Sequence, residues 1–104
     1  MFYHYSQNNS GGSFDIDKER GITVSVYVEA DTPEQADSRA EFIGLYFSGV
    51  AEGRDCDCCG DRWYEASSWD KTALEEIPVA SDNMWSTAGE GIVIHYKDGR
   101  VEWR

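Results

Sequence analysis

The segment that most constrains the fold is a strand pattern that runs directly into a helix start. Over residues 22–29, isoleucine and valine alternate with mostly polar residues, as in a β-strand with one buried face. After it, Thr32 suits a helix N-cap, Pro33 suits the first helical position, and Gln35 completes a capping-box pattern. The chain therefore predicts a strand followed by a helix that packs against a sheet.

The helix is predicted to span about residues 33–43. Ala36, Ala40 and Ile43 follow one another at spacings of four and three, which places them on one stripe of the helix. The small alanines allow the helix to lie close to a sheet. Gly44 suits the left-handed residue that ends many helices.

A β-hairpin is predicted over residues 92–103. Asp98–Gly99 is a strong signal for a two-residue type I′ turn. That turn pairs His95 with Glu102 and places both on a polar outer face. The opposite, apolar face then comprises Ile92, Ile94, Tyr96, Val101 and Trp103.

Together these segments predict an α+β domain. Residues 2–6 form another short strand, rich in aromatic side chains, whereas residues 65–91 show the weakest signal, with a short helix near 71–76. The order of strands, one helix and then strands favours an antiparallel sheet with one main helix on one face. At 104 residues, the chain is expected to form a single domain, 1–104.

The composition is strongly acidic. The chain has 9 Lys and Arg residues against 20 Asp and Glu residues, which gives a net charge of −11. This charge disfavours long nucleic acid as a partner, because nucleic-acid binding needs cationic side chains. It suits a partner with a basic surface or mimicry of a nucleic-acid surface, and it equally suits a protein that is merely soluble. No run approaches the ~18 apolar residues of a membrane span, so we expect no membrane partner.

All three cysteines fall within one polar run, Arg54–Trp63. Cys56 and Cys59 have the spacing of a zinc knuckle, and Cys58 adds a third sulfur. A closed zinc site needs a fourth ligand, and His4 is the better candidate because the other histidine is expected on the outer face of the hairpin. We therefore predict a zinc site formed by Cys56, Cys58, Cys59 and His4, and no other cofactor.

Two alternatives to zinc remain open for this run. One is a loop of reduced thiols without a metal, which fits the absence of a second cysteine pair. The other is a redox motif, although the sequence after Cys59 does not look like the helix start that such motifs use. A chain this short also gains stability from a metal or a dimer, so a homodimer is a candidate assembly.

Arg54, Arg62 and Trp63 border the cysteines and are candidate ligand-binding residues. Two arginines beside an aromatic ring can hold a phosphate and stack a base, as a small nucleotide would require. The alternative is that both arginines pair with the aspartates of the same run and order the loop. No catalytic Ser–His–Asp arrangement or phosphate-binding glycine motif accompanies them, so we expect that the protein is not an enzyme.

Three sequence blocks, Tyr3–Phe14, Ala40–Phe47 and Gly53–Trp63, stand in a fixed order. They include the strings HYSQNNSGGSF and RDCDCCGDRW. Together they resemble a family of small uncharacterised proteins encoded by tailed bacteriophages. No established activity goes with that family, so the resemblance implies no functional residue. It implies a phage protein that acts in the cytoplasm of the bacterial host.

These observations favour a small acidic binding protein that antagonises a host defence system by binding a host protein. The acidic charge and the lack of a catalytic arrangement motivate this hypothesis. Two others stay open. One is sequestration of a small cyclic-nucleotide signal by Arg54, Arg62 and Trp63, and the other is a zinc-stabilised interaction module.

Overall fold

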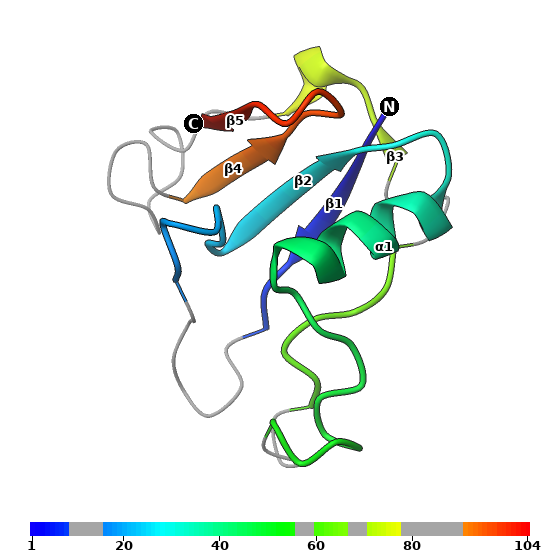
Figure 1. Cartoon of the computed structure of the whole chain (residues 1–104), viewed down its shortest axis with the longest axis vertical. Coiled ribbons are helices and arrows are strands. Elements are labelled where there is room, and N and C mark those ends of the chain that lie inside the picture. The colour runs from blue at the N-terminus through cyan, green and yellow to red at the C-terminus, as the bar shows by residue number, and fades with distance from the viewer. Residues whose placement is uncertain (9–15, 56–59, 67–70, 78–90) are drawn as a thin grey trace.

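A five-stranded sheet with one α-helix on one face forms the centre of the protein (Figure 1). The computed structural model describes residues 1–8, 16–55, 60–66, 71–77 and 91–104. The elements are β1 (Phe2–Ser6), β2 (Ser25–Glu29), α1 (Pro33–Ile43), β3 (Lys71–Thr72), the 3₁₀ helix η3 (Leu74–Glu76), β4 (Ile92–His95) and β5 (Val101–Trp103). The strand order across the sheet is β3-β1-β2-β4-β5.

The α+β prediction is confirmed, including the helix and the C-terminal hairpin, but the sheet is mixed. β1 pairs antiparallel with β2 and with β3, and β5 pairs antiparallel with β4. β2 and β4, however, run parallel. Parallel neighbours need a long connection that returns the chain to the same end of the sheet, and here that connection contains α1. The predicted wholly antiparallel sheet is therefore wrong at this one pair.

The helix begins and ends at the predicted residues. The hydroxyl of Thr32 accepts a hydrogen bond from the backbone N–H of Gln35 at 3.2 Å. The side-chain oxygen of Gln35 accepts a hydrogen bond in return from the backbone N–H of Asp31 at 3.2 Å. A capping box would use the N–H of the next residue, Thr32, as this donor. Gly44 ends the helix in the left-handed region with φ of 118°. Local capping chemistry therefore fixes both ends of α1.

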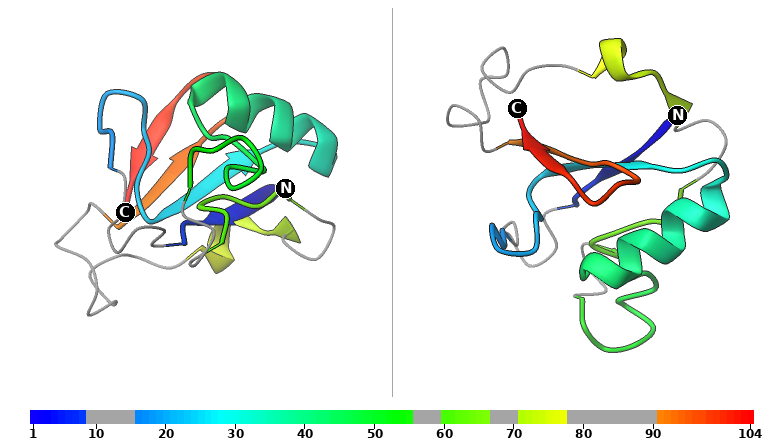
Figure 2. Two further views of the ribbon diagram at one scale, coloured as in Figure 1. Left: turned by 90° about the horizontal axis from the view of Figure 1, so that it is seen from below. Right: turned by 45° about the horizontal axis from the view of Figure 1, so that its top comes forward.

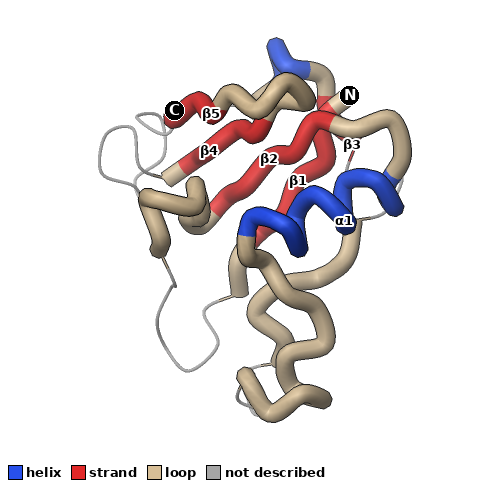
Figure 3. The backbone as a smooth tube through the Cα atoms, viewed as in Figure 1, coloured by secondary structure: helices blue, strands red, loops and turns tan. Residues whose placement is uncertain are grey.

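Side chains on both faces of the sheet are buried, and Figure 2 shows α1 and η3 on opposite sides of it. On the helix side, Val26 and Val28 of β2 pack with Ala36 and Ala40 of α1 in one cluster. On the opposite side lies a second cluster, comprising Phe2, Tyr27, Ile77, Ile92, Ile94 and Tyr96. Leu74 of η3 and Ile77 directly after it pack on this second side, and Figure 3 shows η3 as the short blue helix that follows β3. The alternation in β2 predicted a single buried face, and the second buried face comes from contacts distant in the sequence.

The C-terminal hairpin forms with a register different from the predicted one. The N–H of Tyr96 donates to the carbonyl of Arg100 at 2.9 Å, and the N–H of Gly99 donates to the carbonyl of Tyr96 at 3.0 Å. The turn thus contains three residues, with Gly99 in the left-handed region at φ of 95°, which is the common three-residue hairpin. The two-residue type I′ turn is wrong, and His95 faces Val101 rather than Glu102.

The shift by one residue moves Val101 and Trp103 to the face that carries His95, whereas Ile92, Ile94 and Tyr96 stay together on the face predicted for them. His95 is not on the outer face but buried, with 2% of its surface exposed. Its Nε2 atom lies 2.7 Å from the carbonyl oxygen of Gly21, in the turn that precedes β2. Burial lowers the pKa of His95 below its ordinary value of 6.5, and the positive charge of Arg39 adds to this shift. His95 therefore holds the turn against the sheet as a neutral ring that donates from Nε2.

The lowered pKa of His95 predicts a pH-dependent stability. The unfolded chain binds a proton at this histidine more readily than the folded one, so its contribution is complete above pH 6.5 and is lost as the pH falls from 6.5 through the lowered folded-state pKa. Urea denaturation over this pH range should show wild type losing free energy of unfolding faster than His95→Gln, which keeps an N–H donor but does not titrate. Parallel pH profiles for the two proteins would contradict this account.

A matched pair of glycine substitutions tests the close contact at this turn. Gly21 has φ of 73°, and a Cβ atom there would lie 2.6 Å from Cε1 of His95. Gly99 has φ of 95° with no atom within 4 Å of its would-be Cβ. Gly99→Ala should lower the free energy of unfolding by ~1–2 kcal/mol, because alanine disfavours the left-handed backbone conformation. Gly21→Ala should cost ~1–3 kcal/mol more, since the ring must move. Equal losses in urea denaturation would show that the turn yields freely.

Candidate functional site

The described residues on either side of the cysteines form one hydrogen-bonded network, which we call the neck. The predicted ligands Cys56, Cys58 and Cys59 lie outside the described residues. The neck comprises Gln7, Asn8, Tyr46, Asp55, Asp61 and Arg62. It joins residues before and after the cysteines to the sheet, so the position of this run is fixed at both ends.

Asp55 is the centre of the neck. Its carboxylate is buried, with 1% side-chain exposure, and lies 3.8 Å from Nε of Arg62. It accepts hydrogen bonds from the hydroxyl of Tyr46 at 2.8 Å and from the backbone N–H of Arg62 at 2.8 Å. A buried carboxylate needs such partners to offset its desolvation. Gly49 makes room for it, because a Cβ atom there would lie 1.9 Å from Asp55 Oδ2.

Arg62 carries the network on to the sheet. Its Nη1 atom donates to the side-chain oxygen of Gln7 at 2.8 Å. The side-chain nitrogen of Gln7 in turn donates to the carbonyl of Thr23 at 3.1 Å. The backbone N–H of Asn8 donates to the carbonyl of Arg62 at 2.8 Å. The alternative prediction was that both arginines pair with the aspartates of this run, and the pairing of Arg62 with Asp55 is confirmed.

The three predicted ligand-binding residues do not converge on one cavity. Trp63 is 2% exposed and belongs to the helix-side core, so its ring stabilises the fold. Arg62 is engaged in the neck. Arg54 is exposed and its guanidinium carbon lies 4.4 Å from the ring centroid of Tyr46, in a cation–π contact. Arg54 is thus the member of this set whose side chain faces solvent.

His4 lies on the side of the sheet opposite to α1. Its ring stacks on Tyr27, with the centroids 4.3 Å apart and the planes at 4°. Trp63 and Ala66, which follow the cysteines, pack on the helix side instead. Within the described ranges, no group of three or more His, Cys, Asp or Glu residues could hold a metal ion. The zinc site therefore stays a prediction, and its fourth ligand lies across the sheet from Trp63.

One half-buried anchor escaped the sequence analysis. Asp37 of α1 accepts a hydrogen bond from the hydroxyl of Tyr5 at 2.6 Å and another from the backbone N–H of Ala66 at 2.8 Å. This single carboxylate oxygen ties the helix to β1 and to the segment after the cysteines. The sequence carries no local signal for it, since both partners are about thirty residues away.

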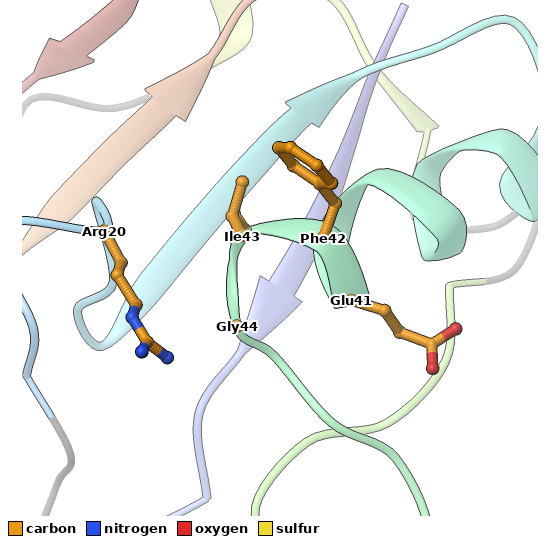
Figure 4. Close-up of a pocket in the computed structure, with 5 residues that line it drawn as sticks. All are labelled: Arg20, Glu41, Phe42, Ile43 and Gly44. Atoms are coloured by element: carbon orange, nitrogen blue, oxygen red, sulfur yellow. The ribbon is translucent and has the colours of Figure 1, made fainter.

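A second feature, a hollow at the C-terminal end of α1, also went unpredicted. It has a volume of about 510 Å³ and is lined by Arg20, Glu41, Phe42, Ile43 and Gly44 (Figure 4). Phe42 is 79% exposed. A signal for it existed, because Phe42 is an apolar helix residue outside the Ala36–Ala40–Ile43 stripe.

Comparison with known proteins places the chain in a family. The family described as a domain of unknown function, DUF7296, matches residues 1–103. The chain belongs to this family. Neither curated proteins nor solved structures gave a match. The family thus spans the sheet, the helix and the neck, and it brings no assigned activity. No helix among the described residues is long and apolar enough to cross a membrane.

The central role of Asp55 predicts the effect of removing its charge. Asp55→Asn keeps the shape but weakens the acceptors for Tyr46 and Arg62, so we expect a loss of ~1–3 kcal/mol in the free energy of unfolding. Glu52→Gln changes the charge equally at an exposed position nearby and should stay within ~0.5 kcal/mol of wild type. Urea denaturation of both variants measures the difference. A wild-type midpoint for Asp55→Asn would rule out the neck as a stabilising network.

Proposed function

We propose that this protein is a non-enzymatic binding protein that acts by occupying a basic surface of a host protein. In the context implied by its sequence blocks, it is a phage protein that antagonises a host defence system in the bacterial cytoplasm. The observation that carries the proposal is the set of exposed glutamates that stand outside the ion pairs of the described residues. Anionic side chains in this state attract a basic surface and accelerate its association.

The ion pairs leave most of the acidic surface uncompensated. Within the described ranges, the paired residues are Asp17 with Arg20, Asp55 with Arg62, Asp31 with Lys97, Asp98 with Arg100, and Glu102 with Arg104. The exposed glutamates outside these pairs are Glu19, Glu34, Glu41, Glu52, Glu65, Glu75 and Glu76. They are spread over α1, η3 and the loops, and α1 and η3 lie on opposite sides of the sheet (Figure 2). The molecule therefore presents negative charge on both sides.

A small nucleotide is the less supported ligand. Trp63 is in the core and Arg62 is held by Asp55 and Gln7, which leaves Arg54 over Tyr46 as the accessible pair. One arginine in a field of net charge −11 gives a phosphate little attraction. The zinc-stabilised module is the remaining alternative, and zinc analysis of untagged protein with a Cys59→Ser control decides it.

Salt and charge dependence of partner binding tests the proposal. Tagged protein is used to isolate a host partner, and association rates are then measured with the purified pair. Glu34→Gln/Glu75→Gln/Glu76→Gln should slow association by about tenfold at low salt and flatten its salt dependence, because rim charges act on the association rate. The matched control Ser38→Ala changes an exposed neutral residue of the same helix and should bind as wild type does. Failure to isolate a partner, or a triple variant with wild-type rates, would refute the proposal.

A further inference from the structure

The hollow at the C-terminal end of α1 is bordered by an unusually exposed aromatic ring. Phe42 projects from the last turn of α1 with 79% of its surface exposed. Its contact within the described residues is with Arg39, whose guanidinium carbon lies 5.2 Å from the ring centroid. Aromatic and arginine side chains together are typical of the energetic centres of protein interfaces. An exposed ring of this kind beside an open hollow therefore indicates a contact surface.

The hollow is lined by one cation and one anion that do not pair with each other. Figure 4 shows Arg20 and Glu41 on opposite sides of Ile43 and Gly44. Arg20 keeps 66% of its side chain exposed although it lies 3.5 Å from Asp17. Its guanidinium also reaches the end of α1, because a Cβ atom on Gly44 would lie 3.2 Å from Arg20 Nη1. The two charges thus lie on either side of the residues Ile43 and Gly44.

The net charge around the hollow indicates which kind of partner binds there. Asp17, Arg20, Arg39 and Glu41 sum to zero, whereas the whole chain carries −11. A basic partner would gain no net attraction here. For two copies of this acidic chain, by contrast, a neutral apolar surface is where approach costs least repulsion.

We propose that this face is a homodimer contact, in which Phe42 of each copy enters the hollow of the other. An isologous interface must be self-complementary, since residue i contacts residue j and residue j contacts residue i across the two-fold axis. Arg20 of one copy then meets Glu41 of the second, and Glu41 meets the second Arg20. The contact uses Glu41 alone among the exposed glutamates, and the others remain available to the basic partner.

The test is the solution mass of the full chain by sedimentation velocity over a concentration series. Wild type should rise from 11.7 kDa toward twice that mass. Phe42→Ser should remain a monomer throughout. Tyr64→Ser changes another exposed aromatic, at 57% exposure, and should dimerise as wild type does. Circular dichroism confirms that each variant is folded, which is expected because both rings are exposed.

A charge exchange makes the test specific for the pairing. Arg20→Glu alone and Glu41→Arg alone should each raise the dimer dissociation constant about five- to tenfold, because each places like charges across both symmetric contacts. The combined variant Arg20→Glu/Glu41→Arg should recover the wild-type constant. A monomeric wild type, a Phe42→Ser variant that still dimerises, or a double variant as weak as the singles would overturn the proposal. A monomeric wild type that loses the host partner on Phe42→Ser would assign the face to that partner instead.

Discussion

The structure depends on the burial of β2 from both sides. Val26 and Val28 meet the alanines of α1 on one face, while Tyr27 meets the second cluster on the other. A strand at the centre of a sheet buries apolar side chains on both of its faces, and such burial offsets chain entropy in a domain this small. β1 and β4 are ordered as its neighbours. The helix α1 then packs on one side of the sheet, and Leu74 and Ile77 pack on the other.

Two carboxylates, one buried and one half-buried, anchor the irregular half of the chain to this sheet. Asp37 fixes the segment after the cysteines to α1 and β1, and Asp55 closes the neck around the cysteine-rich run. Each carboxylate is satisfied by several donors, which is the condition under which burial of a charge is tolerated. The run with the most distinctive chemistry in the sequence is thus held at its ends by residues whose role is structural. Arg62 and Trp63, which border it, serve the same purpose.

The surfaces that we propose to have functions therefore lie away from the cysteine-rich run, residues 54–63. The exposed glutamates give the molecule its negative field, and the hollow beside Phe42 is a neutral apolar exception within it. The two proposed surfaces differ in charge and share only Glu41, so we expect binding of a basic partner and of a second copy to be compatible. Membership of a family without an assigned activity leaves these surfaces as the guides to function.

The sequence by itself determined the local elements. The bounds of α1, its caps at Thr32 and Gly44 and the strand β1 were predictable, because capping and alternation act between residues a few positions apart. Only the tertiary structure decided the parallel pairing of β2 with β4, the register of the hairpin and the burial of His95. The tertiary structure also determined which groups donate hydrogen bonds to Asp37 and Asp55. Hydrogen bonds and packing between residues far apart in the chain leave no periodic trace in the sequence, and a one-residue change in a turn reverses every face that follows it.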